Sequence, residues 1–505
     1  MNPPTALNFY HEPLFSLEKL YRAYRQCRRG KRSTSNALIF EQNLEENLLV
    51  LHQQLITGTY QPGRSIAFLV KKPKMREIFA ADFADRVIHH LLVSYLEPQW
   101  EKRFIHDSCA CRKNKGTLAA VERLTRFSRQ ISANNTRPAW YLQLDIRGFF
   151  ININRPILYQ RLQAKEKNPA VLWLIRQVLF NEPTENCLLK GHKRADFLLL
   201  PAHKTLFKAQ PECGLPIGNL TSQFFANVYL DALDQFVKHQ LKARYYVRYC
   251  DDFILLSASR TELEQHKQSI ATFLGQTLSL TLNPIQKLQR LSNGMNFLGY
   301  IIRSDYRLVR NRVVGNLYER LMAAEQHLRH QGMVVTKTRA KLIWDWPMLS
   351  KLKQSINSYY AHFAKANSYK LVTKIIKRFD WLNYFFIWQM KGRQIMASFR
   401  YPVARYYPSF KQQVRYLLQS LPGHLCVIEV GLRYQIYDCE VGKNETIKAV
   451  LVQTLKIKLT ALLRLLTQWH ENRVQNITLI RQSHEANGQI IRRKISTQWL
   501  LYQAL

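Results

Sequence analysis

The sequence predicts an α+β fold in which short strands and amphipathic helices alternate along the chain. Three stretches support this class. Residues 140–145 alternate between two faces, as a strand with one buried face does. Residues 225–241 carry apolar side chains at helical spacing. Residues 248–256 have aromatic and β-branched flanks around two acidic residues, which is typical of two strands joined by a tight turn.

The charge of the chain is strongly positive and limits the classes of partner. Lys and Arg number 74 against 35 Asp and Glu, a formal net charge of +39. Self-repulsion on this scale is tolerated where a polyanion neutralises it, so nucleic acid is the first expected partner and an anionic membrane surface the second. No apolar run approaches the ~20 residues of a membrane-spanning helix, and residues 1–32 lack a signal-peptide core. We therefore expect a cytoplasmic chain without a membrane partner.

The cysteines give no sign of a disulfide framework. The chain has eight of them and no C-x-x-C pair, and a large cytosolic protein seldom contains structural disulfides. One loop-like segment holds Cys187, His192, His203 and Cys213. Zinc binding by these four residues is an alternative, although their spacing fits no zinc-finger pattern.

The N-terminal part is expected to contain helices followed by a basic β-hairpin. Apolar spacing predicts two helices within residues 1–60, and residues 64–80 predict two strands around a Lys-Pro-Lys tip. A helix over 82–96 and a basic turn over 111–117 follow. The cations at the hairpin tip suit a triphosphate, and a merely solvated turn is the alternative. These cations are Lys71, Lys72, Lys74 and Arg76.

Three carboxylates form the candidate functional centre. Asp145 ends the strand 140–145 on its polar face, and Asp251 and Asp252 are adjacent at the acidic turn. Adjacent carboxylates repel each other unless a cation lies between them. Hard divalent cations such as Mg²⁺ prefer carboxylate oxygens. The pattern therefore predicts a divalent-metal site, with a solvated hairpin tip as the alternative.

A glycine-containing loop over 214–223 precedes the helix of 225–241. Asn219, Thr221 and Ser222 are candidates for capping that helix. Because glycine lets the backbone approach a ligand closely, this loop is a candidate binding element. A plain helix-entry loop is the alternative.

The remainder of the chain predicts a strand over 297–302 and a helical, basic and aromatic segment over 304–400. The aromatic residues of that segment alternate with Lys and Arg, which favours nucleic-acid contact over a purely structural core. Composition shifts near residue 400, where we place a domain boundary. Beyond it we expect a hairpin turning at Gly431, followed by a helix over 455–469.

The order of these parts resembles the fingers, palm and thumb of reverse transcriptases over most of residues 1–390. Within that class the chain is most similar to reverse transcriptases of diversity-generating retroelements. Residues 78–90, 106–117, 144–150 and 214–223 carry this likeness. Cys250 stands where a small or thioether residue is usual.

A second, weaker resemblance concerns the C-terminal part. Residues 407–440 resemble the N-terminal mismatch-recognition domain of MutS proteins. Arg433 and Gln435 replace the Phe and Glu of that family, so mismatch reading is not carried over.

The first resemblance implies an RNA-directed DNA polymerase that copies an RNA template into cDNA by two-metal nucleotidyl transfer. Two Mg²⁺ ions, with Mn²⁺ as an alternative, would be held by Asp145, Asp251, Asp252 and the Ile146 carbonyl. The residues implied to bind the incoming deoxynucleotide are Lys71, Lys72, Arg76, Ile146, Phe150, Ile217, Gly218 and Lys287. Those implied to position the primer are Phe297, Leu298, Gly299 and Tyr300. The implied partners are template RNA, the cDNA or primer, deoxynucleotides and an accessory basic protein.

The resemblance also implies a right-hand polymerase architecture with four parts. These are an N-terminal helical segment (1–60), fingers and palm (61–303), a helical thumb (304–400) and a small α/β module that binds nucleic acid (401–505). Phe150 would exclude the ribose 2′-OH. Ile217 stands where accurate reverse transcriptases carry Gln, which implies error-prone copying.

Three alternatives stay open. A defence-associated reverse transcriptase would have the same chemistry and another biological role. A group II intron maturase fits less well, because no endonuclease motif follows the thumb. A catalytically silent RNA-binding module is the alternative from another class, and the three carboxylates argue against it.

Overall fold

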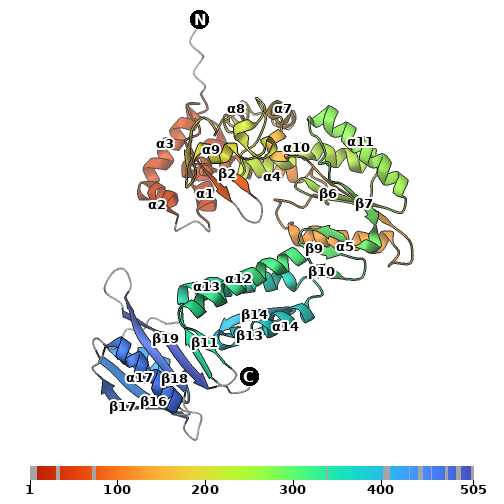
Figure 1. Ribbon diagram of the computed structural model, residues 1–505. Helices are drawn as coiled ribbons and strands as arrows, with labels where there is room; N and C mark the ends of the chain where they lie inside the picture. Colours follow the sequence, from red (N-terminus) through yellow and green to blue (C-terminus); the bar gives the residue numbers. More distant parts are fainter. Residues whose placement is uncertain are drawn as a thin grey trace. The chain divides into compact units, whose positions relative to one another are not determined.

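The computed structural model describes residues 8–29, 34–70, 75–336, 339–401, 410–430, 433–441, 447–455, 458–472, 476–484 and 491–501. The chain forms two compact units (Figure 1). The first comprises Met1–Leu298 with Ile302–Asp305, and the second comprises Gly299–Ile301 with Tyr306–Leu505. Both contain helices and strands, which confirms the predicted mixed fold. Among the described helices, none is long and apolar enough to cross a membrane.

The first unit begins with helices α1 (Leu17–Arg28), α2 (Ser35–Gln42) and α3 (Leu44–Ile56). Where two helices were predicted there are three, because Asn43 has a non-helical backbone with φ of −124°. Both α1 and α2 contact α4 (Phe83–Glu101). The rings of Tyr24, Phe40 and Phe83 meet in this contact.

The predicted basic hairpin is present. Strands β1 (Ser65–Val70) and β2 (Arg76–Ala80) pair antiparallel, and β4 (Cys187–Leu189) adds to β1 in parallel. Buried Glu77 accepts hydrogen bonds from the Thr205 hydroxyl at 2.6 Å and from the Leu206 amide. The segment that follows β4 is thereby attached to the hairpin. The tip, with Lys71 and Lys72, lies outside the described residues.

A four-stranded antiparallel sheet, called here the central sheet, organises the first unit. Its strands are β5 (Tyr246–Tyr249), β6 (Asp252–Ser257), β3 (Trp140–Asp145) and β7 (Lys287–Arg290), in that order. The predicted strand over 140–145 is confirmed. Helices α10 (Leu220–Gln235) and α11 (Arg260–Leu278) share one hydrophobic core with the sheet. Helix α5 (Thr117–Ile131) also contacts β5 and β6.

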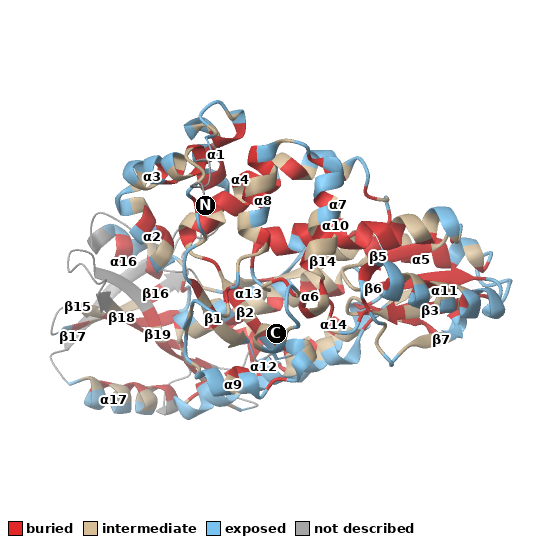
Figure 2. Ribbon diagram, turned by 90° about the horizontal axis from the view of Figure 1, so that it is seen from above, coloured by how far each residue is buried: buried red, intermediate tan, exposed pale blue. Residues whose placement is uncertain are grey.

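Burial explains why this part of the chain is so apolar. Figure 2 shows α10 buried along most of its length, so it is a central helix rather than a surface one. A π-helical turn, η4 (Phe236–Gln240), ends it. The shorter elements of the unit are η1 Pro13–Phe15, α6 Phe149–Asn152, α7 Arg155–Lys165, α8 Pro169–Leu179, α9 Arg194–Leu198, η2 Ala202–Lys204, η3 Leu206–Lys208 and η5 Leu291–Asn293.

The predicted continuous strand over 297–302 is wrong. The structure has β8 (Met295–Phe297) and β9 (Tyr300–Ile302), separated by a tight turn. Leu298 and Gly299 both have positive φ, at 49° and 90°, which a strand cannot accommodate. With β10 (Arg307–Val309) these strands form a small sheet of order β10-β9-β8.

The prediction of an all-helical segment over 304–400 is wrong in part. Helices α12 (Asn311–His330), α13 (Trp346–Phe363), α14 (Tyr369–Arg378) and α15 (Leu382–Phe385) are present. Strands β13 (Phe386–Lys391) and β14 (Gln394–Phe399) then pair antiparallel. Gly392, with φ of 60°, opens the two-residue turn between them.

Several aromatic residues of this segment form core rather than a stacking surface. Tyr360, Trp381, Phe385 and Phe386 are buried. By contrast, the Tyr369 side chain of the same segment is strongly exposed, at 72%. The sequence pattern did not separate these roles, because aromatic side chains suit both a packed core and a base-stacking surface.

The second unit ends in a seven-stranded sheet of order β11-β12-β19-β18-β15-β16-β17. The predicted hairpin is present as antiparallel β15 and β16, and its turn residue Gly431 lies outside the described residues. The strands are β11 Val334–Val335, β12 Arg339–Ile343, β15 His424–Val430, β16 Arg433–Val441, β17 Ile447–Leu455, β18 Asn476–His484 and β19 Ile491–Leu501. Two helices, α16 (Phe410–Leu418) and α17 (Leu459–Asn472), complete the unit.

The C-terminal residues share this sheet with the segment before residue 400. Strand β12 pairs with β19. Trp344 Nε1 donates to Gln498 Oε1 at 2.8 Å, and Trp346 Nε1 donates to the Ile495 carbonyl at 2.8 Å. The four domain ranges and the nucleic-acid role of 401–505 stay predictions. That role has to be tested by charge substitutions, because removing 401–505 would leave β12 and both indoles without these partners.

Candidate active site

The three candidate carboxylates come together at one end of the central sheet. Strands β3 and β6 pair in a register that places Asp145 opposite Asp252. Asp251 occupies the turn that joins β5 to β6, next to Cys250, whose φ of 55° turns the chain. The alternation of β3 and the tight turn therefore bring together residues more than a hundred positions apart.

The carboxylates influence one another electrostatically. Burial, together with the charges of Asp145 and Asp251, raises the pKa of Asp252 to about 7. A hydrogen bond from Gln143 and the charge of Lys287 act in the opposite direction. A divalent cation would relieve this repulsion, so the donor set fits such an ion in chemistry and charge.

The side chains of the three carboxylates do not converge on a common metal-binding position. In the described part of the chain, no three His, Cys, Asp or Glu side chains converge closely enough to hold a metal ion as they stand. This applies also to Cys187, His192, His203 and Cys213, the zinc alternative. All eight cysteines are free thiols. The three aspartates would have to turn toward an ion on binding it.

Two amide side chains support the carboxylates, and the sequence did not identify either as functional. Gln143 Nε2 donates to Asp252 Oδ1 at 3.1 Å and to Oδ2 at 3.3 Å. Asn283 Nδ2 donates to Asp145 Oδ2 at 3.1 Å, and its backbone amide donates to the Asp145 carbonyl at 2.7 Å. The signal for Gln143 was its position on the same face of β3 as Asp145. No local signal marked Asn283.

A buried ion pair supports the acidic turn through a hydrogen bond to the turn's backbone. Arg248 and Asp234 are fully buried and share two hydrogen bonds, of 2.8 and 2.6 Å. Arg248 also donates to the Cys250 carbonyl at 3.0 Å and to Ser108 Oγ at 2.9 Å. An arginine inside an apolar strand was the available sequence signal, because buried charges are almost always paired.

Backbone hydrogen bonds attach the glycine loop, which contains Ile217 and Gly218, to Phe150 and to the basic hairpin. The Leu215 amide donates to the Phe150 carbonyl at 2.7 Å, and the Phe79 amide of β2 donates to the Ile217 carbonyl at 2.9 Å. Gly218 has φ of 130°, and a Cβ there would lie 2.9 Å from the Phe79 carbonyl oxygen. The loop is thus attached to the basic hairpin on one side and to α6 on the other.

Of the other residues predicted to bind the nucleotide, the structure describes Arg76 and Lys287. Arg76 begins β2 and is exposed. Lys287 begins β7, where it pairs in register with Gln143. Gly148 has φ of 54°, and a Cβ there would lie 2.7 Å from the His203 carbonyl oxygen, so glycine is needed before α6. Lys71 and Lys72 cannot be placed, because they lie outside the described residues.

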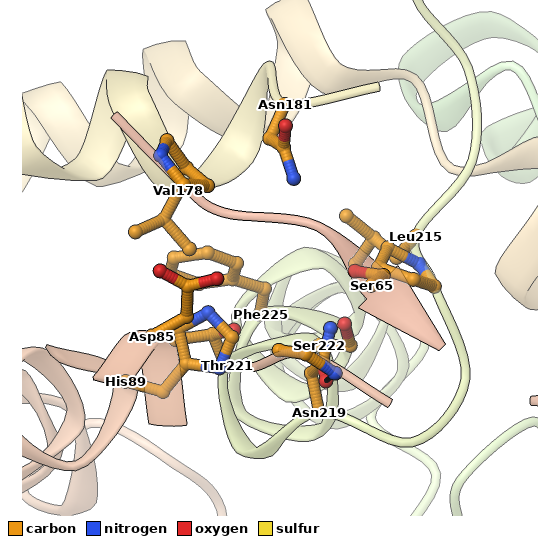
Figure 3. Close-up of a pocket in the computed structure, with 13 residues that line it drawn as sticks. Ser65, Asp85, His89, Val178, Asn181, Leu215, Asn219, Thr221, Ser222 and Phe225 are labelled. Carbon is orange, nitrogen blue, oxygen red and sulfur yellow. Dashed lines mark hydrogen bonds between the residues drawn. The ribbon is translucent and has the colours of Figure 1, made fainter. Parts of the chain in front are cut away.

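A small cavity of about 20 Å³ lies beside the glycine loop and is lined by both polar and apolar residues (Figure 3). That volume suits a single water molecule. Asp85 lines it and accepts from the Tyr60 hydroxyl at 2.8 Å, and burial raises the Asp85 pKa to about 6. Asn219 stands at the start of α10 but does not cap it through its side chain. Its Oδ1 accepts from the Ala81 amide at 3.2 Å instead.

The predicted primer-positioning residues surround the turn between β8 and β9. Within the second unit, the Tyr300 ring stacks on His362 of α13 with centroids 4.1 Å apart. The Tyr300 hydroxyl donates to the His362 carbonyl at 2.9 Å. A Cβ at Gly299 would lie 3.1 Å from His362 Nε2. The glycine therefore allows this turn to approach α13 closely.

Part of the chain is similar to known proteins. Residues 69–302 match the family of reverse transcriptases, described as RNA-dependent DNA polymerases. Protein YkfC of Escherichia coli K12 is 22% identical over 318 residues, covering 56% of this chain and 78% of YkfC. The group II intron-encoded protein LtrA of Lactococcus lactis is 29% identical over 205 residues, covering 40% of this chain but only 30% of LtrA.

Part of the chain is also similar to solved structures of telomerase. Telomerase from Candida tropicalis, in complex with a fragment of telomeric RNA, has a TM-score of 0.37 and 14% identity, covering 52% of this chain and 49% of the telomerase. Telomerase from Candida albicans, also with an RNA fragment, has a TM-score of 0.35 and 10% identity, covering 64% of this chain and 60% of the telomerase.

Proposed function

Because residues 69–302 match the family of reverse transcriptases, we propose that the whole chain copies an RNA template into cDNA. The observation that carries the proposal is the pairing of Asp145 with Asp252 beside Asp251 at one end of the central sheet. A silent RNA-binding module has no use for three carboxylates that repel one another in this way.

The metal ligands would be Asp145, Asp251, Asp252 and the Ile146 carbonyl. Ile146 forms an isolated bridge with Leu282, but the bonds of that bridge come from the flanking residues Asp145 and Arg147. The Ile146 carbonyl is therefore not used by the bridge. Two Mg²⁺ ions, when bound, would lower the pKa of the primer 3′-OH and stabilise the leaving pyrophosphate.

The other residues bind and orient. Arg76, with Lys71 and Lys72 of the same hairpin, would hold the triphosphate, and Lys287 would donate a proton to pyrophosphate. Phe297, Leu298, Gly299 and Tyr300 would position the primer end. Helix α14 supports binding to a nucleic-acid backbone, because it buries Val372 and Ile375 and exposes cations on its other face. These exposed cations are Lys370, Lys374, Lys377 and Arg378.

Primer extension on matched RNA and DNA templates tests the proposal. We expect incorporation on the RNA template in the presence of Mg²⁺ or Mn²⁺, with products whose sequence follows the template. Asp251→Asn serves as the inactive control. RNA binding by the wild type without any extension would favour the silent module instead.

Phe150 is expected to exclude ribonucleotides. The side chain is half-buried and contacts Phe149 edge to face, with centroids 5.3 Å apart. Phe150→Ala would open space for a 2′-OH, and the preference for deoxynucleotides should fall by about tenfold or more. The measurement is kcat/KM for matched ribo- and deoxynucleotides. Phe150→Tyr keeps the ring and is the control; an unchanged preference in active Phe150→Ala would show that the ring only packs.

We further propose that copying is error-prone and serves a diversity-generating retroelement, with template RNA, cDNA and an accessory basic protein as partners. Ile217 supports this, because its side chain offers contact to the nucleotide but no directional hydrogen bond. A template repeat beside a variable target gene would support this role, and a phage-defence island would support the defence alternative. A cytoplasmic location stays a prediction.

Ile217→Gln is expected to lower misincorporation opposite template adenine several-fold. The Ile217 carbonyl, which bonds Phe79, belongs to the backbone and is unaffected by the substitution. The new amide can therefore act on the nucleotide without moving the loop, and a mispair then costs more relative to a correct pair. Sequencing of cDNA gives the error spectrum, with Ile217→Val as the control. Identical spectra for all three enzymes would count against the idea.

A further inference from the structure

The polar face of β3 is attached to the segment that leads into the primer-positioning turn. The Tyr141 hydroxyl donates to Gln289 Oε1 of β7 at 2.9 Å and lies 3.4 Å from the Gly294 carbonyl, and Gln143 Nε2 donates to the Asn296 carbonyl at 3.3 Å. Alternate residues of the strand thus meet alternate residues of the facing segment. Asp145 is the next residue on that face of β3, and Phe297 directly follows Asn296.

Gln143 differs from Tyr141 because it also contacts a candidate catalytic carboxylate. The same Nε2 atom donates to both oxygens of Asp252, at 3.1 and 3.3 Å. A primary amide nitrogen carries two hydrogens, so one can point to the carboxylate and the other to the Asn296 carbonyl. Three oxygens surround this nitrogen, so the opposite amide orientation would place Oε1 against three acceptors. The orientation of the amide is therefore fixed by its neighbours.

We propose that Gln143 is a positioning residue that couples the Asp252 carboxylate to the backbone of the strand carrying the primer end. The inference rests on the proposed polymerase function. Gln143 itself need not touch the substrate. It fixes the position of Phe297 and Leu298, which directly follow Asn296, relative to the carboxylate, which would hold metal.

The chemistry makes such a coupling consequential. In nucleotidyl transfer, the primer 3′-OH must lie about 3–3.5 Å from the atom it attacks, and a misplacement of about 1 Å can slow a reaction about a hundredfold. Asp252 lies on β6 and Asn296 lies on β8. Those strands are not hydrogen-bonded neighbours in any described sheet. The Gln143 amide is a direct connection between them.

A purely structural role explains the residue less well. The Oε1 atom of Gln143 is buried and has no hydrogen-bond partner in the described part of the chain. A buried acceptor without a partner destabilises the fold, so an apolar side chain of the same length would suit a packing role better. The amide is instead explained by the hydrogen bonds of its nitrogen to the Asp252 carboxylate and to the Asn296 carbonyl.

The test compares Gln143→Met, which keeps the length and removes the donor, with two controls. Asn296→Ala leaves the carbonyl that Gln143 uses. Tyr141→Phe removes the hydroxyl contacts to Gln289 and Gly294, neither of which reaches Asp252. With a preformed primer–template, Gln143→Met should lower kcat by about tenfold or more. We expect KM for the nucleotide, primer–template affinity and melting temperature to stay close to wild type. Both controls should keep kcat within about threefold.

A second measurement does not depend on activity. Hydrogen exchange of the backbone amides of residues 295–300 should become faster in Gln143→Met than in Asn296→Ala. The exchange of β3 and β6 should stay unchanged, because their backbone ladder is intact.

The inference is overturned if Gln143→Met keeps kcat within twofold of wild type. It is also overturned if Gln143→Met and Tyr141→Phe lose kcat and melting temperature equally, which would show a structural role only. Unchanged exchange of residues 295–300 would overturn the coupling itself. If the wild type extends no primer while exchange responds as expected, the proposed function fails and the coupling stands.

Discussion

Asp252→Asn is expected to reduce primer extension on the order of a thousandfold or more while the protein stays folded. The side chain lies opposite Asp145 in the sheet and beside Asp251. An amide has almost the same shape, but it carries no charge to hold a divalent cation. Asp251→Asn should behave in the same way.

Stability should not fall in these variants. The pKa of Asp252 is raised by burial and by two neighbouring carboxylates, so the charged form is unfavourable in the folded protein without metal. Replacing it by Asn removes that repulsion, and the melting temperature should be equal or higher. Single-nucleotide extension and thermal unfolding in one buffer check both statements, with the exposed Asp305→Asn as the control. Near-wild-type extension by Asp252→Asn would refute the assignment of the active site.

Arg248→Met is expected to lower the free energy of unfolding by about 3–5 kcal/mol, because it leaves the buried Asp234 charge without its partner. Both side chains of this ion pair are fully buried. The substitution also removes the donors to the Cys250 carbonyl and to Ser108. The acidic turn should therefore lose its support together with stability.

Denaturant unfolding measures this effect, and two further variants interpret it. Arg260→Met breaks an exposed pair with Glu264 and should cost no more than about 0.5 kcal/mol. The double variant Arg248→Met with Asp234→Leu should recover part of the loss, since no unpaired charge is left. A loss below about 1 kcal/mol in Arg248→Met would show that the pair contributes little.

The sequence predicted the parts of the site that depend on local patterns. The alternation of residues 140–145 placed Asp145 on the polar face of a strand, and the tight turn at 251–252 placed two carboxylates together. Both features have short periods, so a few neighbouring residues specify them. The basic hairpin was predicted for the same reason.

The features that were missed depend on contacts between distant residues. Asn283 reaches Asp145 from 138 positions away, and Gln143 reaches Asn296 from 153 positions away. The break at Leu298 was missed because a non-glycine residue with positive φ has no local sequence signature. The hairpin of β13 and β14 was missed because its aromatic residues also suit a helix packed in a core.

The pairing of β12 with β19 sets the order in which the second unit can fold during synthesis. The bond from Trp344 to Gln498 spans 154 positions. At about 5–20 residues per second, the ribosome needs on the order of ten seconds to make the intervening chain. Through that interval β12 can pair with β11 but not with β19, so its other edge stays unpaired and available to chaperones or to another copy of the chain. The sheet can therefore be completed only after β19 has been synthesised. A product interrupted before β19 would keep this exposed strand edge, which proteases could recognise.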